Sequence, residues 1–308
     1  MSDRDVELSR DQAVALVAEG VDVPTPSGRG SNLIRRSLRL GRTRVGLVLV
    51  GILVLISVFG PLIAPHASDE FVGKPFSAPG NGALFGTDYL GQDVWSRFLD
   101  GGLTILVLAV VSTAMGLVVG LAIGLVAAYS RNWLDDVLMR AMDVIMAFPQ
   151  IMLALVAVSL VGPKNWVTII AIALTTAPRV ARVARGAAQP VVERDFIGAT
   201  EAMGMSRVRI ISGELFPNIL GPMMVEASLR LTYSIAVIAA LAFLGLANDP
   251  NGANWGTMIQ QNQLSLATQP WGALLPILAI ALLTMGTGLI GDGIARTAAG
   301  IDRERGDE

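Results

Sequence analysis

Thiols and imidazoles are almost missing from this chain of 308 residues, which has no cysteine and one histidine, His66. Structural zinc, haem, iron–sulfur and thiol chemistry are therefore effectively excluded. Lysine is also scarce, and the two lysines, Lys74 and Lys164, are followed by Pro75 and Asn165. No phosphate-binding Gly-x-x-x-x-Gly-Lys-Ser/Thr loop exists, so nucleotide binding through that motif is excluded.

Charge is low as well. Charged residues make up 16% of the chain, well under the roughly 25% of a soluble globular domain. The net charge of −2 gives no support to a nucleic-acid partner. No Ser/His/Asp set, carboxylate dyad or metal cluster occurs within the apolar runs, so we expect no catalysis, no metal site and no cofactor in this chain.

Apolar sequence is what the chain has in abundance, with 53% hydrophobic residues and a mean hydropathy of +0.59. Six apolar runs are each long enough to cross ~30 Å of hydrocarbon at ~1.5 Å of rise per residue. They predict an all-α integral membrane protein with six transmembrane helices, at residues 45–64, 102–129, 137–160, 166–184, 218–246 and 271–290.

Arginine placement predicts the orientation of these spans. A cluster from Arg35 to Arg44 precedes the first run, and loops rich in arginine stay in the cytosol. We therefore expect both termini in the cytosol, with a largely flexible tail at 1–40, a six-helix domain at 41–295 and a second tail at 296–308. A capping-box pattern from Ser9 to Gln12 predicts a short helix at 13–19. The segment 65–102 is then extracytoplasmic, and the segment 191–217 lies in the cytosol.

The polar segment 191–217 separates the fourth and fifth runs. Apolar residues recur along it at roughly helical spacing, namely Phe196, Ile197, Met203, Val208 and Ile211. Glycine permits the backbone to change direction. The pattern predicts a short amphipathic helix, a break near Gly204 and a second helical piece that runs to Pro217.

This segment resembles the cytoplasmic coupling loop of binding-protein-dependent ABC importer permeases. That loop has Glu-Ala-Ala, three residues, Gly, nine residues and Ile-x-Leu-Pro; here Ala199, Gly204 and Pro217 match, whereas Gly198 and Glu214 depart from it. The resemblance implies a helix on the membrane surface that presents apolar residues to a groove on an ATPase subunit. An ordinary interhelical loop is the alternative. The residues expected to couple to the ATPase are Phe196, Ile197, Gly198, Ala199, Thr200, Met203, Gly204 and Met205.

Residues 84–102 carry a second resemblance, to the Phe-Gly-Thr-Asp-x-Leu-Gly-Arg-Asp-x-x-Ser-Arg segment of dipeptide, oligopeptide and nickel permeases. Gln92 stands where that group usually has arginine. We expect Thr87 or Asp88 to cap a short helix at 89–99. The segment is either a scaffold plug that seals the outer end of the bundle or a direct substrate contact. Its motif residues include Thr87, Asp88, Gly91, Asp93, Ser96 and Arg97.

Glu226 and Arg230 form a charge pair inside the fifth predicted span, at i and i+4 on one helical face. Arg230 lies roughly 20 Å along the helix from Pro217, too deep to reach water by snorkelling alone. Our hypothesis is that the pair borders the translocation pathway and meets the charged ends of a peptide. The alternative is a self-neutralised pair inside the bundle.

Small residues and proline predict how the spans pack. Gly116, Gly120 and Gly124 lie at a spacing of four on one face of the second span. Small residues in that register allow another helix to approach closely, either within this subunit or from a partner subunit. Pro149 is expected to kink the third span, because it removes one helical hydrogen bond.

Three arginines at a spacing of three, Arg179, Arg182 and Arg185, mark the cytosolic end of the fourth span. Long basic side chains at a helix end often reach toward phospholipid headgroups. We therefore expect them to anchor the helix at the membrane surface, with contact to an ATPase as the alternative.

Over roughly residues 40–295 the chain resembles the C-type permease subunit of a dipeptide, oligopeptide or nickel ABC importer. The resemblance implies the type I, methionine-transporter-like permease fold in a bacterial cytoplasmic (inner) membrane. It also implies a heterodimer with a sister permease, two ATPase subunits that hold ATP and Mg²⁺, and an extracytoplasmic substrate-binding protein.

Peptides are the expected substrate, and nickel, glutathione or another small solute are alternatives. Two other classes remain open. An ion-coupled secondary transporter needs intramembrane carboxylates and an inverted repeat; Glu226 is the one carboxylate available, and no repeat is evident. A scaffold subunit would have no pathway of its own.

Overall fold

The computed structural model describes residues 36–80, 82–130, 133–249 and 252–299. Within these ranges the regular structure is helical, and β pairing is limited to three isolated bridges between residues 71 and 93. The expected helix at 13–19 lies outside the described residues.

Five of the six expected spans are single long helices. Each is long and apolar enough to cross a membrane. They are α3 (Gly41–Ile63), α5 (Gly102–Ser130), α8 (Asn165–Val192), α11 (Phe216–Phe243) and α13 (Trp271–Ala299).

The expected third span is instead two helices, α6 (Trp133–Met146) and α7 (Gln150–Val161), bent by 78°. Pro149 is the residue before α7, with φ −58° and ψ 129°. Proline lacks an N–H, and it disfavours helical geometry at the residue before it. The structure therefore has a break where the sequence predicted a kink within one helix.

Two helices run further than the sequence predicted. Helix α8 continues past residue 184 to Val192, where the last residues are buried. Helix α13 does not stop at the glycines near residue 291 but runs to Ala299. Gly291 packs against Ser228 and Gly293 against Thr43, so these glycines serve close helix contacts instead of ending the helix.

The glycine stripe of α5 packs against α8 of the same chain. A methyl group added at Gly116 would lie 2.9 Å from Cβ of Thr176, and one at Gly120 would lie 2.5 Å from the Ala177 carbonyl oxygen. Such distances leave no room for a side chain, so the two backbones touch. Of the two alternatives for this stripe, packing within the subunit is therefore the one observed.

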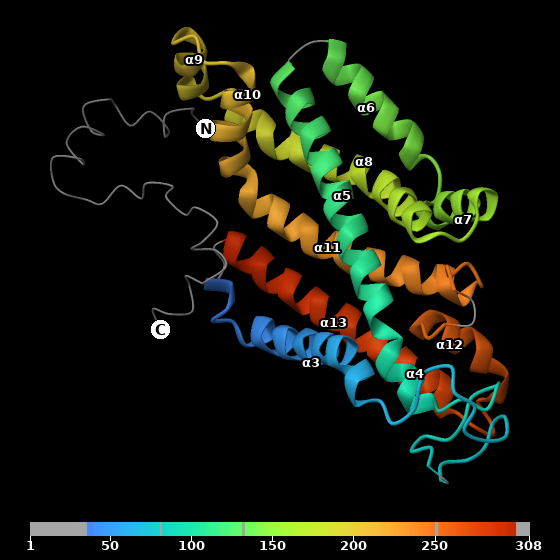
Figure 1. Cartoon of the computed structure of the whole chain (residues 1–308). Helices are drawn as coiled ribbons and strands as arrows, with labels where there is room; N and C mark the ends of the chain where they lie inside the picture. The colour runs from blue at the N-terminus through green and yellow to red at the C-terminus, as the bar shows by residue number, and fades with distance from the viewer. Residues whose placement is uncertain (1–35, 81, 131–132, 250–251, 300–308) are drawn as a thin grey trace, which may run out of the picture.

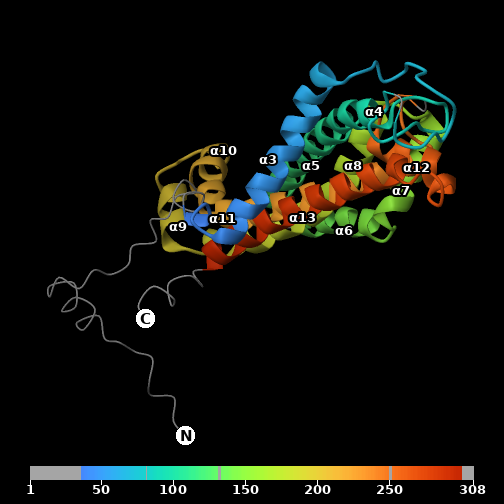
Figure 2. The ribbon, with the colours of Figure 1, turned by 90° about the horizontal axis from the view of Figure 1, so that it is seen from below.

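The helices run between two ends of the molecule (Figures 1 and 2). The short helices α9 (Asp195–Ala202) and α10 (Arg207–Ile210) lie at one end with the beginning of α3 and the end of α13. The segment 64–93, the short helix α4 (Val94–Asp100) and α12 (Trp255–Asn262) lie at the other.

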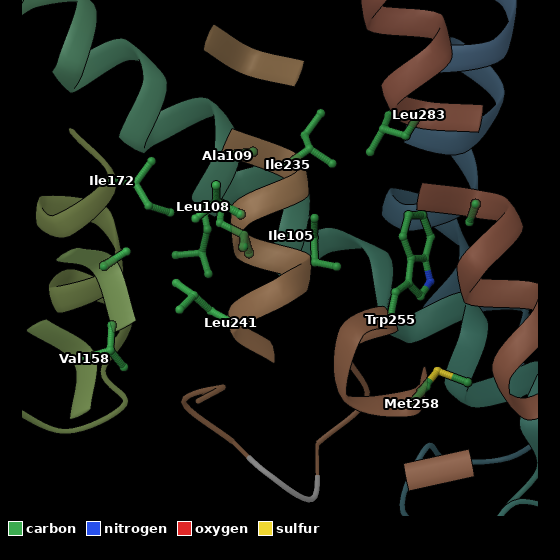
Figure 3. Close-up of a cluster of buried hydrophobic side chains, with 14 of the residues drawn as sticks. Ile105, Leu108, Ala109, Val158, Ile172, Ile235, Leu241, Trp255, Met258 and Leu283 are labelled. Atoms are coloured by element: carbon green, nitrogen blue, oxygen red, sulfur yellow. The ribbon is translucent and has the colours of Figure 1, made fainter. Parts of the chain in front are cut away.

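A buried apolar cluster fills the bundle toward the α12 end (Figure 3). Trp255 is fully buried in it, and its indole Nε1 donates to the Phe98 carbonyl oxygen at 2.9 Å. The Trp255 and Phe98 rings stack with centroids 5.5 Å apart. Because Phe98 belongs to α4, these contacts fix the 64–101 segment to the helices beneath it.

Candidate functional site

Helix α9 ends where the sequence predicted a break. Gly204 has φ +76°, and its N–H donates to the Glu201 carbonyl oxygen at 2.9 Å. The N–H of Met205 donates to the Thr200 carbonyl oxygen at 3.2 Å. This pair of bonds is a Schellman motif, in which glycine adopts the left-handed conformation with little strain. The predicted helix and its break at Gly204 are both confirmed.

One face of α9 is buried and another is open. Ile197 is fully buried and Thr200 is 9% exposed, and Ile197 packs in an apolar cluster with Ile210 and Leu215. Met205 is partly buried against the same cluster. The other residues expected to couple to a partner are exposed: Phe196, Gly198, Ala199, Met203 and Gly204. Ile197, Thr200 and Met205 therefore pack the segment against the rest of the chain, and the other predicted residues lie on its surface.

The chain runs without a break from α10 into the long helix α11. A π turn at Ile211–Leu215 joins them, and the Phe216 N–H donates to the Ile211 carbonyl oxygen. Pro217 follows directly and cannot donate, so a locally widened helix accommodates it without ending the helix. The backbone is therefore helical without interruption from α10 through the π turn into α11.

Two of the three arginines near the end of α8, Arg182 and Arg185, form ion pairs with α6, which the sequence did not predict. Arg185 donates from Nε and Nη2 to the two carboxylate oxygens of Asp135, each at 2.6 Å. Arg182 pairs with Asp143. Two-point contact of this kind fixes orientation as well as distance. These pairs tie α6 to α8.

Glu226 and Arg230 form the predicted i, i+4 pair, with Arg230 Nε 2.8 Å from Glu226 Oε1. Their side chains are 7% and 11% exposed. Arg230 Nε and Nη1 and Glu226 Oε1 are buried and have no well-aligned hydrogen bond to any residue that the structure describes. The Arg230 guanidinium lies 5.5 Å from the ring centroid of Tyr233, and the guanidinium of Arg179 lies 5.8 Å from the same ring. Sequence reasoning missed this grouping, because Arg179 lies on a different helix.

The motif within residues 84–102 is held together by contacts among its own residues. Arg97 and Asp88 form an ion pair with both side chains fully buried. Asp88 Oδ1 also accepts from the N–H groups of Leu90 and Gln92, each at 2.9 Å. A buried charge is tolerated only where partners of this kind surround it.

Asp93 caps α4, and neither Thr87 nor Asp88 does so. Its carboxylate accepts from the Ser96 N–H at 3.1 Å and from Ser96 Oγ at 2.6 Å. The predicted helix at 89–99 therefore begins only at Val94. Asp88 is unavailable as a cap because it holds Arg97 and the loop N–H groups.

The remaining motif residues hold the loop. Thr87 Oγ1 donates to the Lys74 carbonyl oxygen at 2.5 Å and accepts from the Ser77 N–H at 2.8 Å. Gly91 has φ +87° and touches the Gly73 backbone, so no side chain fits there. Burial raises the pKa of the neighbouring Tyr89 hydroxyl, since it disfavours the phenolate. The six predicted motif residues are brought together, and all are buried.

Two open cavities, each of about 500 Å³, lie at the two ends of the bundle. Neither was anticipated from the sequence, because each is lined by segments far apart in the chain. The cavity beside the 64–101 segment is polar and includes Asp69, Asp100, Thr104, Asn165, Asp249 and Asn254 in its lining. The cavity beside α9 is lined by Tyr129, Ser130, Trp133, Leu134, Glu201, Met205 and Arg207.

The fold is similar to that of a known class of membrane transport protein. It is similar to a solved chain of the MetNI methionine ABC transporter in an inward-facing conformation, with a TM-score of 0.52 and 19% sequence identity. The match covers 66% of this chain and 96% of that one. The architecture is the type I ABC importer permease fold, as the sequence predicted.

The family follows from the sequence. Residues 120–298 match the profile of the binding-protein-dependent transport system inner membrane component, and residues 43–79 match the N-terminal TM domain of oligopeptide transport permease C. The chain belongs to the binding-protein-dependent transport system inner membrane component family. It is a multi-pass protein of the bacterial inner membrane.

Two curated relatives illustrate the similarity. A putative peptide transport system permease protein of Brucella suis biovar 1 is 37% identical over 263 residues, which is 84% of this chain and 88% of that protein. The dipeptide transport system permease protein DppC of Alkalihalophilus pseudofirmus is 34% identical over 251 residues, covering 81% and 83% of the two chains.

Proposed function

We propose that this chain is the transmembrane subunit of an ATP-driven importer and forms half of a translocation pathway for di- and oligopeptides. The observation that carries the proposal is similarity over most of the chain to permeases named for peptide and dipeptide transport. Nickel or another small solute is the alternative cargo. The extracytoplasmic binding protein in such a system usually selects the cargo, so similarity of the permease leaves this alternative open.

The proposed assembly has a sister permease as the other half of the pathway. Two cytosolic ATPase subunits bind ATP and Mg²⁺, and an extracytoplasmic protein delivers the substrate. In this arrangement α9, both termini and the Arg182 and Arg185 end of α8 face the cytosol, and the 65–102 segment faces outward. The chain itself has no enzymatic role.

Coupling is proposed to run through α9. Its exposed apolar residues Phe196, Ala199 and Met203 would fit a hydrophobic groove on an ATPase subunit. The continuous path from α10 through the π turn into α11 would carry the motion into the membrane. ATP binding would favour the outward-open state through contacts that differ between the two states.

The motif within residues 84–102 is proposed to be a structural plug that seals the outer end of the bundle. The geometry that supports this is the complete burial of Asp88 and Arg97 and their engagement with one another, which leaves little to offer a substrate. Glu226 and Arg230 lie at mid-span and are proposed to border the pathway.

The proposal is tested by reconstituting the whole complex in liposomes and measuring uptake of a labelled tripeptide and of Ni²⁺. We expect tripeptide uptake that needs ATP and the binding protein and persists when ion gradients are dissipated. Uptake driven by an ion gradient without ATP would support a secondary transporter instead. Uptake of Ni²⁺ but not of peptide would reassign the substrate.

A further inference from the structure

Two arginines from different helices share one aromatic ring at the middle of the bundle. Arg179 of α8 and Arg230 of α11 lie 5.8 and 5.5 Å from the ring centroid of Tyr233. The two helices pack side by side (Figure 1). Each arginine is about 20 Å from either end of its helix, at ~1.5 Å per residue. The grouping therefore lies far from both ends of α8 and of α11.

The grouping carries excess positive charge. Glu226 pairs with Arg230, but Arg179 makes no ion pair or hydrogen bond with any residue that the structure describes. One carboxylate against two guanidinium groups leaves a net charge of +1. Arg230 also retains a buried Nη1 with no hydrogen-bond partner in the described part of the chain. Donors are therefore available for one further anion.

Exposure indicates where this anion would come from. Tyr233 is 52% exposed and its neighbour Leu229 is 46% exposed, so this face of α11 is not covered by the rest of the chain. Arginine facing hydrocarbon at mid-depth is strongly unfavourable, and such residues usually face a water-filled cavity or a partner. The face therefore fits the wall of an aqueous pathway better than a lipid contact.

We propose that Arg179, Arg230 and Tyr233 form a carboxylate-binding site that receives the C-terminal carboxylate of a peptide during translocation. The inference rests on the proposed importer function and adds a specific site and ligand group to it. A guanidinium presents paired donors that match a planar carboxylate. The Tyr233 ring holds the two guanidinium groups near each other through cation–π contacts. Glu226 orients Arg230 and neutralises one of the two charges.

The test compares trialanine with trialanine amide, which lacks the carboxylate charge. The complete complex is reconstituted in liposomes with binding protein loaded with either peptide, and uptake per ATP hydrolysed is measured. We expect the wild type to favour trialanine by about tenfold, the effect of losing hydrogen bonds to a charged group. Arg179→Gln and Arg230→Gln should reduce this preference to near one by slowing trialanine uptake.

The matched control is Arg182→Gln, one turn further along α8, where the side chain pairs with Asp143. It should leave the preference unchanged. Tyr233 is exposed, so Tyr233→Leu should assemble normally. It should reduce the preference for trialanine over trialanine amide by about threefold. This variant therefore tests the site even if an arginine variant does not assemble.

The outcomes separate the two proposals. Equal uptake of both peptides by the wild type, or a preference that Arg179→Gln, Arg230→Gln and Tyr233→Leu all leave intact, overturns the carboxylate site and leaves the importer function standing. An equal loss of preference in Arg182→Gln also overturns it. Absence of ATP-dependent uptake of either peptide overturns the importer function and the site together.

Discussion

Single residues in the 64–101 segment show how this chain accommodates buried charge. Asp88 accepts two backbone N–H groups and pairs with Arg97, and Arg97 also donates to the Gly252 carbonyl oxygen at 3.3 Å. Charges removed from water are stable only when such partners replace the water. The pair therefore holds the 64–101 segment in place. Loss of either residue would leave the other charge buried without a partner.

Removing one member of the buried pair should be severe. Arg97→Leu leaves Asp88 buried without its cation, and we expect a loss of about 3–5 kcal/mol in the free energy of unfolding. Arg182→Gln, at an exposed ion pair, should change it by only about 0–1 kcal/mol. Thermal unfolding of the purified complex in detergent measures both. Equal shifts for the two variants would contradict the structural role assigned to Arg97.

The turn after α9 depends on one glycine. Gly204→Ala forces a side chain into the left-handed conformation at φ +76° and should destabilise the α9 end by about 1 kcal/mol. Gly198→Ala is the control, because Gly198 lies inside the helix with open space around it and alanine favours helix. Amide hydrogen exchange of residues 195–205 should rise for the first variant and fall or stay constant for the second. Equal exchange in both would show that the turn does not need glycine.

At the scale of elements, helix–helix contact in this bundle depends on small residues. The glycines of α5 bring its backbone against α8, and Gly46 of α3 meets Gly286 of α13. Neither pair gains from apolar burial, since lipid is as apolar as the helices; close packing supplies the attraction. A periodic stripe of glycine in the sequence predicts such a contact, but the partner helix is determined only in three dimensions.

A methyl group in the α5–α8 contact should be costly. Gly120→Ala places Cβ 2.5 Å from the Ala177 carbonyl oxygen, so the helices must separate, with an expected loss of about 1–3 kcal/mol. Gly186→Ala in α8 has nothing within 4 Å and should be neutral or stabilising. Thermal unfolding of both variants gives the comparison. An unchanged free energy of unfolding in Gly120→Ala would contradict the close α5–α8 contact.

At the scale of the whole molecule, the two ends of the bundle differ in character. At the end that carries the 64–101 segment, hydrogen bonds and a buried ion pair hold the loop, whereas the end that carries α9 presents a short helix with exposed apolar side chains. This difference fits the proposal that the subunit receives motion at α9. The continuous α10 to α11 path joins that surface to the helix that carries Glu226 and Arg230.

Adjacent residues of α9 should separate docking from folding. Phe196 is exposed and Ile197 is fully buried. Phe196→Asp should leave the unfolding temperature unchanged and abolish peptide-stimulated ATPase activity, because it places a charge in an apolar contact. Ile197→Ala should instead reduce the free energy of unfolding by about 2–5 kcal/mol through the cavity it creates. Normal ATPase stimulation in Phe196→Asp would exclude this face from coupling.

Local pattern was sufficient for much of this protein. The length of an apolar run relative to bilayer thickness is a property of contiguous residues, so the long spans were predictable. The turn at Gly204 was predictable for the same reason, since its hydrogen bonds join neighbours in the chain. Helix ends were less accurate, because burial against other helices extended α8 and α13 past their polar residues and glycines.

Contacts between distant segments were decided by tertiary structure alone. Sequence spacing could not show that Arg185 meets Asp135, that Asp93 instead of Asp88 is free to cap α4, or that Arg179 shares a ring with Arg230. The physical reason is competition: a charged side chain has several possible partners, and packing of the helices determines which one lies within reach. Local sequence therefore predicted five long membrane-spanning helices, and packing determined their ends and which residues meet between them.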